Sequence, residues 1–280
     1  MINTYLSQCR RVAPSELPLY RKVTFSVLPL YRKVTLSVLP LEIIVIILEK
    51  LPLKDLLNLS ETNKELREII KNVRLSHTIK LKKWTDEKLM CIINNYNFVN
   101  FDLSRSNITD KGIGVLNNHY CHYVNISSCY RIRDEGIKAL SNCHTVDLSH
   151  CHLVTDEGIK ALSNCHTVDL SYCHSVTDEG IKALSNCHTV NLIFCCLVTD
   201  EGIKALSNCH TVNLSWCRLV TDEGIKALSN CHTVKFSCNL VTDKGIKALS
   251  NCHTVKFYSC SLVTDEGIKA LRNNGCIIYH

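Results

Sequence analysis

The chain alternates between two patterns of apolar and polar positions over most of its length. In residues 143–164, Val146 and Leu148 are separated by polar residues, which is the alternation of a strand with one buried face. Ile159 and Leu162 then follow at a spacing that is typical of a short helix. This stretch therefore predicts a strand followed by a short helical return.

The strand and helix pattern recurs with a period of about 22 residues, which indicates a solenoid. One glycine marks each clear copy: Gly136, Gly158, Gly180, Gly202, Gly224, Gly245 and Gly267. Weaker copies start near His77 and end with a partial strand near Ile278. We expect about nine units over residues 75–280, forming an α/β solenoid with a parallel concave sheet and short convex helices.

The cadence of each unit resembles the cysteine-containing leucine-rich repeats of F-box proteins. It is carried by Cys143, Val146, Leu148, Cys151, Val154, Thr155, Asp156, Gly158 and Ile159. The units are shorter than is usual in that family, so we expect a thin convex side. On that side, Asp156 and Lys160 have the spacing of a solvated ion pair.

The repeats also explain most of the 18 cysteines. The resemblance places two columns of them in the core, where a thiol acts as a small apolar group. These columns are Cys143, Cys165, Cys187, Cys209, Cys231 and Cys252, and Cys129, Cys151, Cys173, Cys195, Cys217, Cys238 and Cys260. A zinc site needs converging ligands and a catalytic thiol needs one oriented site, so we predict no metal, no cofactor and no enzyme.

The charge and hydropathy of the chain limit the classes of partner that it can bind. The formal net charge is +6 at pH 7, but the basic surplus lies in residues 1–83, so we predict no nucleic-acid partner for the repeats. The longest apolar run, residues 39–48, is too short to span a bilayer, and no secretory signal is apparent. We expect no membrane association, a reducing environment for the cysteines, and a cytoplasmic location, with the nucleus as an alternative.

The N-terminal part divides in two. Residues 1–36 contain most of a tandem duplication, residues 17–27 and 28–38, and predict a basic, flexible extension, with a basic docking arm as the alternative. Residues 37–74 predict three short helices ending by about Val73. Pro40 and Pro52 suit first helical turns, and an apolar stripe at helical spacing runs from Ile43 to Leu51.

This helical segment resembles the F-box, because it begins with Leu39 and Pro40 and ends near Asn63 and Lys64. Leu66 replaces an aromatic residue often found late in the motif, so we expect a weaker third helix. The resemblance implies docking on a Skp-type adaptor, which joins a cullin scaffold. The residues at the docking positions are Leu39, Pro40, Ile43, Ile44, Ile47, Leu48, Leu51, Pro52 and Leu56. A bundle that caps the repeats is the plain structural alternative.

The residues that vary between repeats predict a surface for an unknown target protein. Strand positions that face away from the core read Asp147, Asp169, Asn191, Asn213, Lys235 and Lys256. A second column beside them reads His150, Tyr172, Phe194 and Trp216. Exposed aromatic residues flanked by graded charge are typical of protein-binding surfaces. Drift after recent duplication is the alternative.

Together, these resemblances imply a substrate-recognition subunit of a Skp-cullin-F-box ubiquitin ligase that binds its target on the concave face. A stand-alone interaction or decoy module without a link to ubiquitin ligation is the alternative. The near-identical repeats also resemble F-box and repeat proteins of large DNA viruses, which would place the protein in a host cell.

Overall fold

The computed structural model describes residues 39–81, 83–237 and 240–279. The predicted extension and Cys238 lie outside the described residues. The described chain forms two compact units that divide between Asp102 and Leu103. The boundary between these compact units lies later in the chain than the predicted domain boundary between residues 74 and 75. The predicted domain boundary stays a prediction.

The first unit begins with the three predicted helices, α2 (Leu41–Lys50), α3 (Leu53–Thr62) and α4 (Lys64–Asn72). Pro40 and Pro52 precede α2 and α3, where their fixed backbone suits a helix start. The inner faces of the helices bury Ile44, Leu48 and Leu56. Of the predicted apolar stripe, Ile44 and Leu48 are therefore buried, whereas Ile43 is exposed.

Helix α4 forms with Leu66 in the core, because its start is well capped. The side-chain oxygen of Asn63 accepts hydrogen bonds from the backbone N–H groups of Glu65 and Leu66, at 3.0 and 3.1 Å. The Arg67 guanidinium donates to the Ser60 and Glu61 carbonyls at the end of α3. The third helix therefore forms with Leu66 as a core residue in place of the aromatic residue often found in the motif.

Two strands complete the first unit. Strand β1 (Leu75–Lys80) leads into α5 (Asp86–Asn95), and β2 (Phe98–Asp102) pairs with β1 in parallel. The Glu49 carboxylate at the end of α2 accepts from the Ser76 backbone N–H at 2.8 Å, and the His77 ring contacts the Leu51 carbonyl at 2.8 Å. These bonds tie the helices to the first strand.

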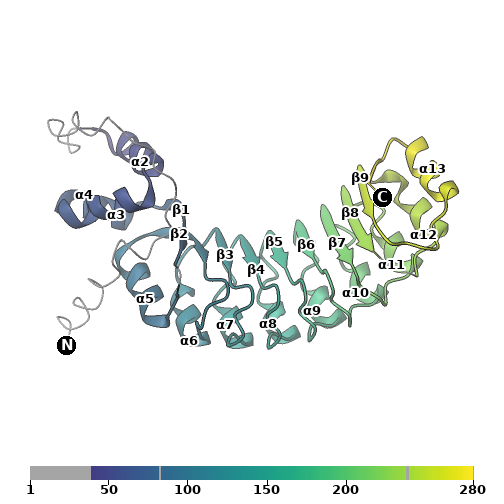
Figure 1. Cartoon of the computed structure of the whole chain (residues 1–280), viewed down its shortest axis with the longest axis horizontal. Helices are drawn as coiled ribbons and strands as arrows, with labels where there is room; N and C mark the ends of the chain where they lie inside the picture. The colour runs from purple at the N-terminus through teal and green to yellow at the C-terminus, as the bar shows by residue number, and fades with distance from the viewer. Residues whose placement is uncertain (1–38, 82, 238–239, 280) are drawn as a thin grey trace. The chain divides into compact units, whose positions relative to one another are not determined.

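The second unit repeats a strand and a short helix, and each strand pairs in parallel with the next one along the chain. In Figure 1 its strands line the inner side of a curve, and its helices the outer side. Its elements are α6 (Asp110–Ile113), η4 (Gly114–Leu116), β3 (Tyr123–Asn125), α7 (Asp134–Lys138), β4 (Thr145–Asp147), α8 (Asp156–Lys160), β5 (Thr167–Asp169), α9 (Asp178–Lys182), β6 (Thr189–Asn191), α10 (Asp200–Lys204), β7 (Thr211–Ser215), α11 (Asp222–Ala227), β8 (Thr233–Ser237), α12 (Asp243–Ala248), η5 (Leu249–Asn251), β9 (Thr254–Phe257), α13 (Asp265–Asn273) and β10 (Ile277–Tyr279).

The repeats stack in register around one apolar core, which confirms the predicted α/β leucine-rich-repeat solenoid. Val146 pairs with Val168, and Val168 with Val190, and all three are fully buried. Helices α7 to α10 have five residues each, so the convex side is thin, as predicted. Among the described residues, no helix combines the length and apolar character that a bilayer span requires.

The described cysteines of both columns lie in this core, as predicted, except Cys260, which is partly exposed. The Cys173 thiol donates to the Leu148 carbonyl of the preceding repeat at 3.2 Å, and the Cys195 thiol repeats this bond with Leu170 at 3.1 Å. Burial raises the pKa of Cys165 to about 12, so the thiol stays protonated. Cys91 of α5 departs from the expectation of reduced cysteines, because it is disulfide-bonded.

The convex charges pair differently from the sequence prediction. Lys160 contacts Glu157 at 2.5 Å, and Asp156 does not take part. Asp156 instead accepts from the Thr177 N–H at 2.8 Å and the Thr177 hydroxyl at 2.6 Å, in the next repeat. The physical reason is that Asp156 lies at the helix start, where the neighbouring repeat offers two donors.

Candidate functional site

The sheet of the second unit carries four columns of side chains outside its core. We call Asp147, Asp169, Asn191, Asn213, Lys235 and Lys256 the strand strip. We call His150, Tyr172, Phe194 and Trp216 the aromatic ladder. A threonine begins each of the strands β4 to β9, as at Thr145, and a histidine comes before it; His122 comes before Tyr123, which begins β3. We call the histidines the histidine ladder: His122, His144, His166, His188, His210, His232 and His253.

The strand strip is half-exposed, and several of its members shape the following turn. The Asp147 carboxylate accepts from the Ser149 backbone N–H at 2.9 Å and from its hydroxyl at 2.6 Å. At the other end, the Lys256 ammonium lies 4.1 Å from the centre of the Tyr279 ring. The predicted gradient from acidic to basic residues is present, but its acidic end also has a structural role.

The aromatic ladder lies in the turn after each strand. Its backbone is left-handed, with φ of 61° at His150, 62° at Tyr172, 58° at Phe194 and 66° at Trp216. Adjacent rings stack with centroids 4.2, 4.8 and 5.4 Å apart along this order. Trp216, at the end of the stack, is 41% exposed.

Bulky residues at such positions are uncommon, because a left-handed backbone favours glycine or asparagine. The same turn position holds small or polar residues at Ser128 and Ser259. Four successive rings therefore occupy a conformation that their side chains disfavour. Backbone strain of this kind points to a use for the side chain itself, here stacking and an exposed aromatic surface.

Sequence reasoning missed the histidine ladder as a surface, although its signal was visible. The constant Cys-His-Thr-Val block gives the histidines from His144 to His253 the same spacing as the repeat glycines. The rings of His210 and His232 stack with centroids 4.3 Å apart, and those of His232 and His253 at 4.4 Å. Neighbouring parallel strands lie about 4.8 Å apart, which accounts for this spacing.

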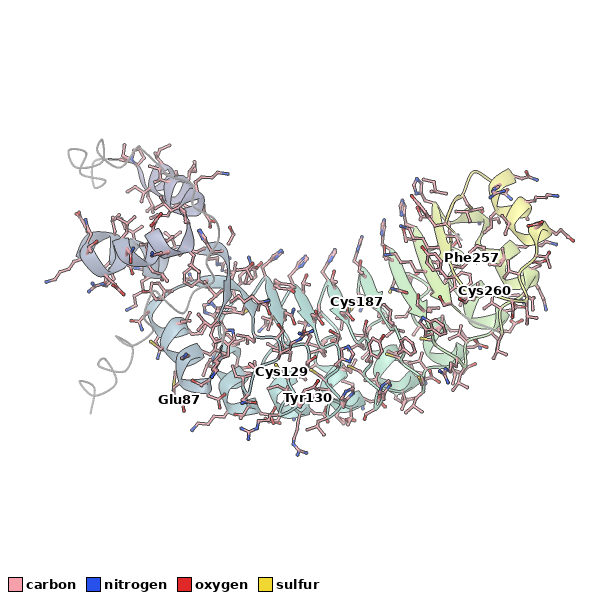
Figure 2. All side chains as sticks on the ribbon, in the orientation of Figure 1. Glu87, Cys129, Tyr130, Cys187, Phe257 and Cys260 are labelled. Carbon is pink, nitrogen blue, oxygen red and sulfur yellow. The ribbon has the colours of Figure 1, made fainter. Side chains whose placement is uncertain are left out.

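Sequence reasoning also missed a cluster near the first repeats of the second unit. Tyr130 stacks on His152 at 6.1 Å, and His152 on His174 at 5.5 Å. Figure 2 marks Tyr130 beside Cys129; Tyr130 is 62% exposed and Cys129 is buried. A shallow pocket of about 500 Å³ lies nearby, lined by Arg105, Ser106, Asn107, Ser128, Tyr130 and His150.

The predicted adaptor-binding residues differ in exposure. Ile44, Leu48 and Leu56 are 3%, 1% and 0% exposed, so they form the core of the helices. Leu39, Ile47 and Leu51 are half-buried, and Pro40, Ile43 and Pro52 are exposed. Their role in docking stays a prediction.

Two further apolar residues of α2, which the sequence prediction left out, are exposed. Leu41 is 53% and Ile46 is 57% exposed, beside Ile43 at 43%. We call Leu41, Ile43 and Ile46 the α2 patch. Helix α2 is thus apolar on both its inner and its outer side.

In the part of the chain that the structure describes, no three His, Cys, Asp or Glu residues are arranged to hold a metal ion. The stacked imidazoles direct their lone pairs side by side, whereas metal ligands must converge on one point.

Family models match both parts of the chain. The model of the F-box domain matches residues 36–78. The model of the leucine-rich repeat matches residues 144–163, 166–185 and 210–229. No curated protein sequence matches this chain significantly.

Solved structures share the solenoid fold. A chain of the Rad7 and Elc1 complex from yeast is 19% identical, with a TM-score of 0.59 over 78% of this chain and 64% of that chain. An internalin, inlF, from Listeria monocytogenes is 14% identical, with a TM-score of 0.58 over 80% of this chain and 73% of that chain. This chain therefore spans just under two thirds of the yeast chain. The matched models and the observed fold together identify the protein as an F-box domain followed by leucine-rich repeats.

Proposed function

We propose that this protein is the substrate-recognition subunit of a Skp-cullin-F-box ubiquitin ligase in the cytoplasm or nucleus. The F-box helices dock on a Skp-type adaptor, which joins a cullin, and the repeats hold a target protein on the concave face. The presence of an F-box domain and leucine-rich repeats supports a role as a ubiquitin-ligase adaptor in general. Neither module is a catalytic domain.

The observation that carries the docking proposal is the α2 patch. Ile44 and Leu48 already fill the core on the inner side of α2, so Leu41, Ile43 and Ile46 are not needed there. Three large apolar side chains in one short exposed helix are costly to leave in water, at about 25 cal/mol per Å². An apolar partner surface removes this cost, and the patch lies inside the matched F-box domain.

The target-binding proposal rests on the aromatic ladder and the strand strip. Trp216 combines a large exposed ring with a strained backbone, and tryptophan is enriched among residues that dominate binding energy. Lys235 has no hydrogen bond or ion pair with another described residue, so its charge is available to a partner. The Rad7 neighbour was solved in a complex with Elc1, which agrees with a solenoid of this fold acting within an assembly.

Affinity purification of the tagged full chain, followed by quantitative mass spectrometry, tests both the adaptor-docking and the target-binding proposals. Ile43→Asp places a charge in the α2 patch without entering the core, so it should remove the Skp-type adaptor and leave the target bound. Trp216→Ala should remove the target and leave the adaptor bound. The control is Lys54→Glu, on the exposed side of α3, which should change neither adaptor binding nor target binding.

The stand-alone interaction module is the competing reading. It predicts that a target co-purifies with the wild-type chain but that no Skp-type adaptor does. Retention of the adaptor by Ile43→Asp at wild-type levels would place the docking surface elsewhere. Full target capture by Trp216→Ala would show that the aromatic ladder is not the main contact.

A further inference from the structure

The histidine ladder is an exposed feature that the proposed function does not use. Its rings stack face to face at centroid distances of 4.3 to 4.5 Å along the whole run. His144 is half-buried and the other rings are exposed. Because neighbours cover the faces of each inner ring, a partner can reach only the ring edges.

One edge of each ring from His144 to His253 is already engaged. The Nδ1 atoms of His210 and His232 lie 3.1 Å from the hydroxyls of Thr211 and Thr233, the residues that follow them. The same contact recurs at His188 and His253. The Nε2 atoms are therefore the ones open to a partner, and in the protonated ring each is a hydrogen-bond donor.

The charges beside the ladder differ between its two ends. Asp147 and Asp169 follow His144 and His166 by three residues on their strands. Strands β6 to β9 contain no aspartate or glutamate, and Lys235 and Lys256 follow His232 and His253 at the same spacing. In the strand strip, the C-terminal half of the ladder thus has neutral or cationic neighbours, Asn191, Asn213, Lys235 and Lys256, and no acidic one.

The ring of His232 holds its proton less tightly than a free imidazole does. Burial, followed by the charges of His210 and His253, lowers the pKa of His232 below its ordinary value. Burial also raises the pKa of the neighbouring thiols, to about 11 at Cys209 and about 12 at Cys231, so they remain uncharged. The charged residues of the strand strip at this end are Lys235 and Lys256. An anion laid along the ring edges would offset the repulsion between protonated rings.

We propose that His210, His232 and His253, with Lys235 and Lys256, form a docking edge for an acidic, carboxylate-rich segment of a partner protein, and that docking takes up protons. This inference deepens the target-binding part of the proposed function and does not require the adaptor. Nucleic acid fits the edge less well, because bases bind proteins by stacking and the faces of the inner rings are covered.

Fluorescence anisotropy with a labelled octaglutamate peptide and the full chain tests this edge at pH 7.5 and pH 6.0. The peptide stays ionised at both values, so only the protein changes charge. Wild-type affinity should rise by about fivefold or more at pH 6.0, as proton-linked binding requires. His210→Gln combined with His232→Gln should remove most of this rise, because glutamine keeps a polar side chain that does not titrate.

A matched control uses the other end of the ladder. His122→Gln combined with His144→Gln should keep the rise, because Asp147 and Asp169 make that end unfavourable for an anion. An equal rise in all three proteins would overturn the proposal, as would tighter binding of an RNA oligonucleotide of the same charge. Circular dichroism at both pH values confirms that each variant is folded. Loss of target capture in Trp216→Ala does not depend on any of these results, so the two failures are distinguishable.

Discussion

Asp178 shows how a single side chain joins two repeats. Its carboxylate accepts from the Thr199 backbone N–H at 2.8 Å and from the Thr199 hydroxyl at 2.6 Å. Close approach of the repeats requires a glycine nearby, because a Cβ at Gly180 would lie 2.5 Å from an Asp156 oxygen and 3.2 Å from its Cα. The recurring Asp and Gly of the constant block are therefore explained by lateral packing.

Asp178→Ala should lower the free energy of unfolding by about 1 to 3 kcal/mol, because it leaves two donors of Thr199 without their acceptor. Glu179→Ala is the matched control on the same helix. It removes an exposed ion pair with Lys182 and should cost about 0.5 kcal/mol or less. Urea unfolding followed by circular dichroism measures both. Equal losses would mean that the Asp to Thr bonds do not stabilise the stack.

His144 of the histidine ladder makes the stability of the fold depend on pH. Burial, followed by the charges of its neighbours His166 and His122, lowers the pKa of His144 in the folded chain. The unfolded chain then binds protons more readily, so the stability from this group is present above about pH 6.5 and is lost as the pH falls through the lowered folded pKa. Thermal melts from pH 7.5 to 5.0 should show this loss, and it should be smaller in His144→Gln. A melting temperature that rises towards pH 5.0 would contradict the predicted loss of stability at low pH.

At the scale of elements, the sequence predicted what depends on local pattern. The strand at Val146 and Leu148, the short helix at Ile159 and the helix starts at Pro40 and Pro52 all follow from periodicity and backbone preference. The left-handed turns at His150 and Trp216 were not predictable, because no glycine or asparagine marks them. The outward face of α2 was also missed, because an apolar helix does not reveal from its sequence which side is buried.

The cap of α4 gives an element-level test. Asn63→Ala removes the acceptor for two backbone N–H groups and should destabilise the first unit by about 1 kcal/mol. Asn58→Ala, at an exposed position inside α3, is the control and should cost less. Hydrogen exchange of the amides of α4 reports the change locally. Unchanged protection in Asn63→Ala would mean that packing of Leu66 and Ile70 alone holds the helix.

In the proposed function, α2 docks on the adaptor and the concave side of the repeats captures the target. The two surfaces share no residue, so each should be removable without loss of the other. The sequence predicted this division of roles through its resemblance to the F-box and to leucine-rich repeats. The identity of the contacting residues could not be read in the same way, because it depends on which apolar and aromatic side chains the fold leaves exposed.

Sequential co-purification shows whether one copy of this chain joins the adaptor to the target. Tagged Skp-type adaptor is first used to capture the full chain from cells, and the material released from it is then captured through the chain's own tag. We expect adaptor, chain and target to be recovered together from the wild-type chain. Ile43→Asp should yield no chain in the first step, and Trp216→Ala should yield adaptor and chain without target. Recovery of the target only from chain that is free of the adaptor would contradict the claim.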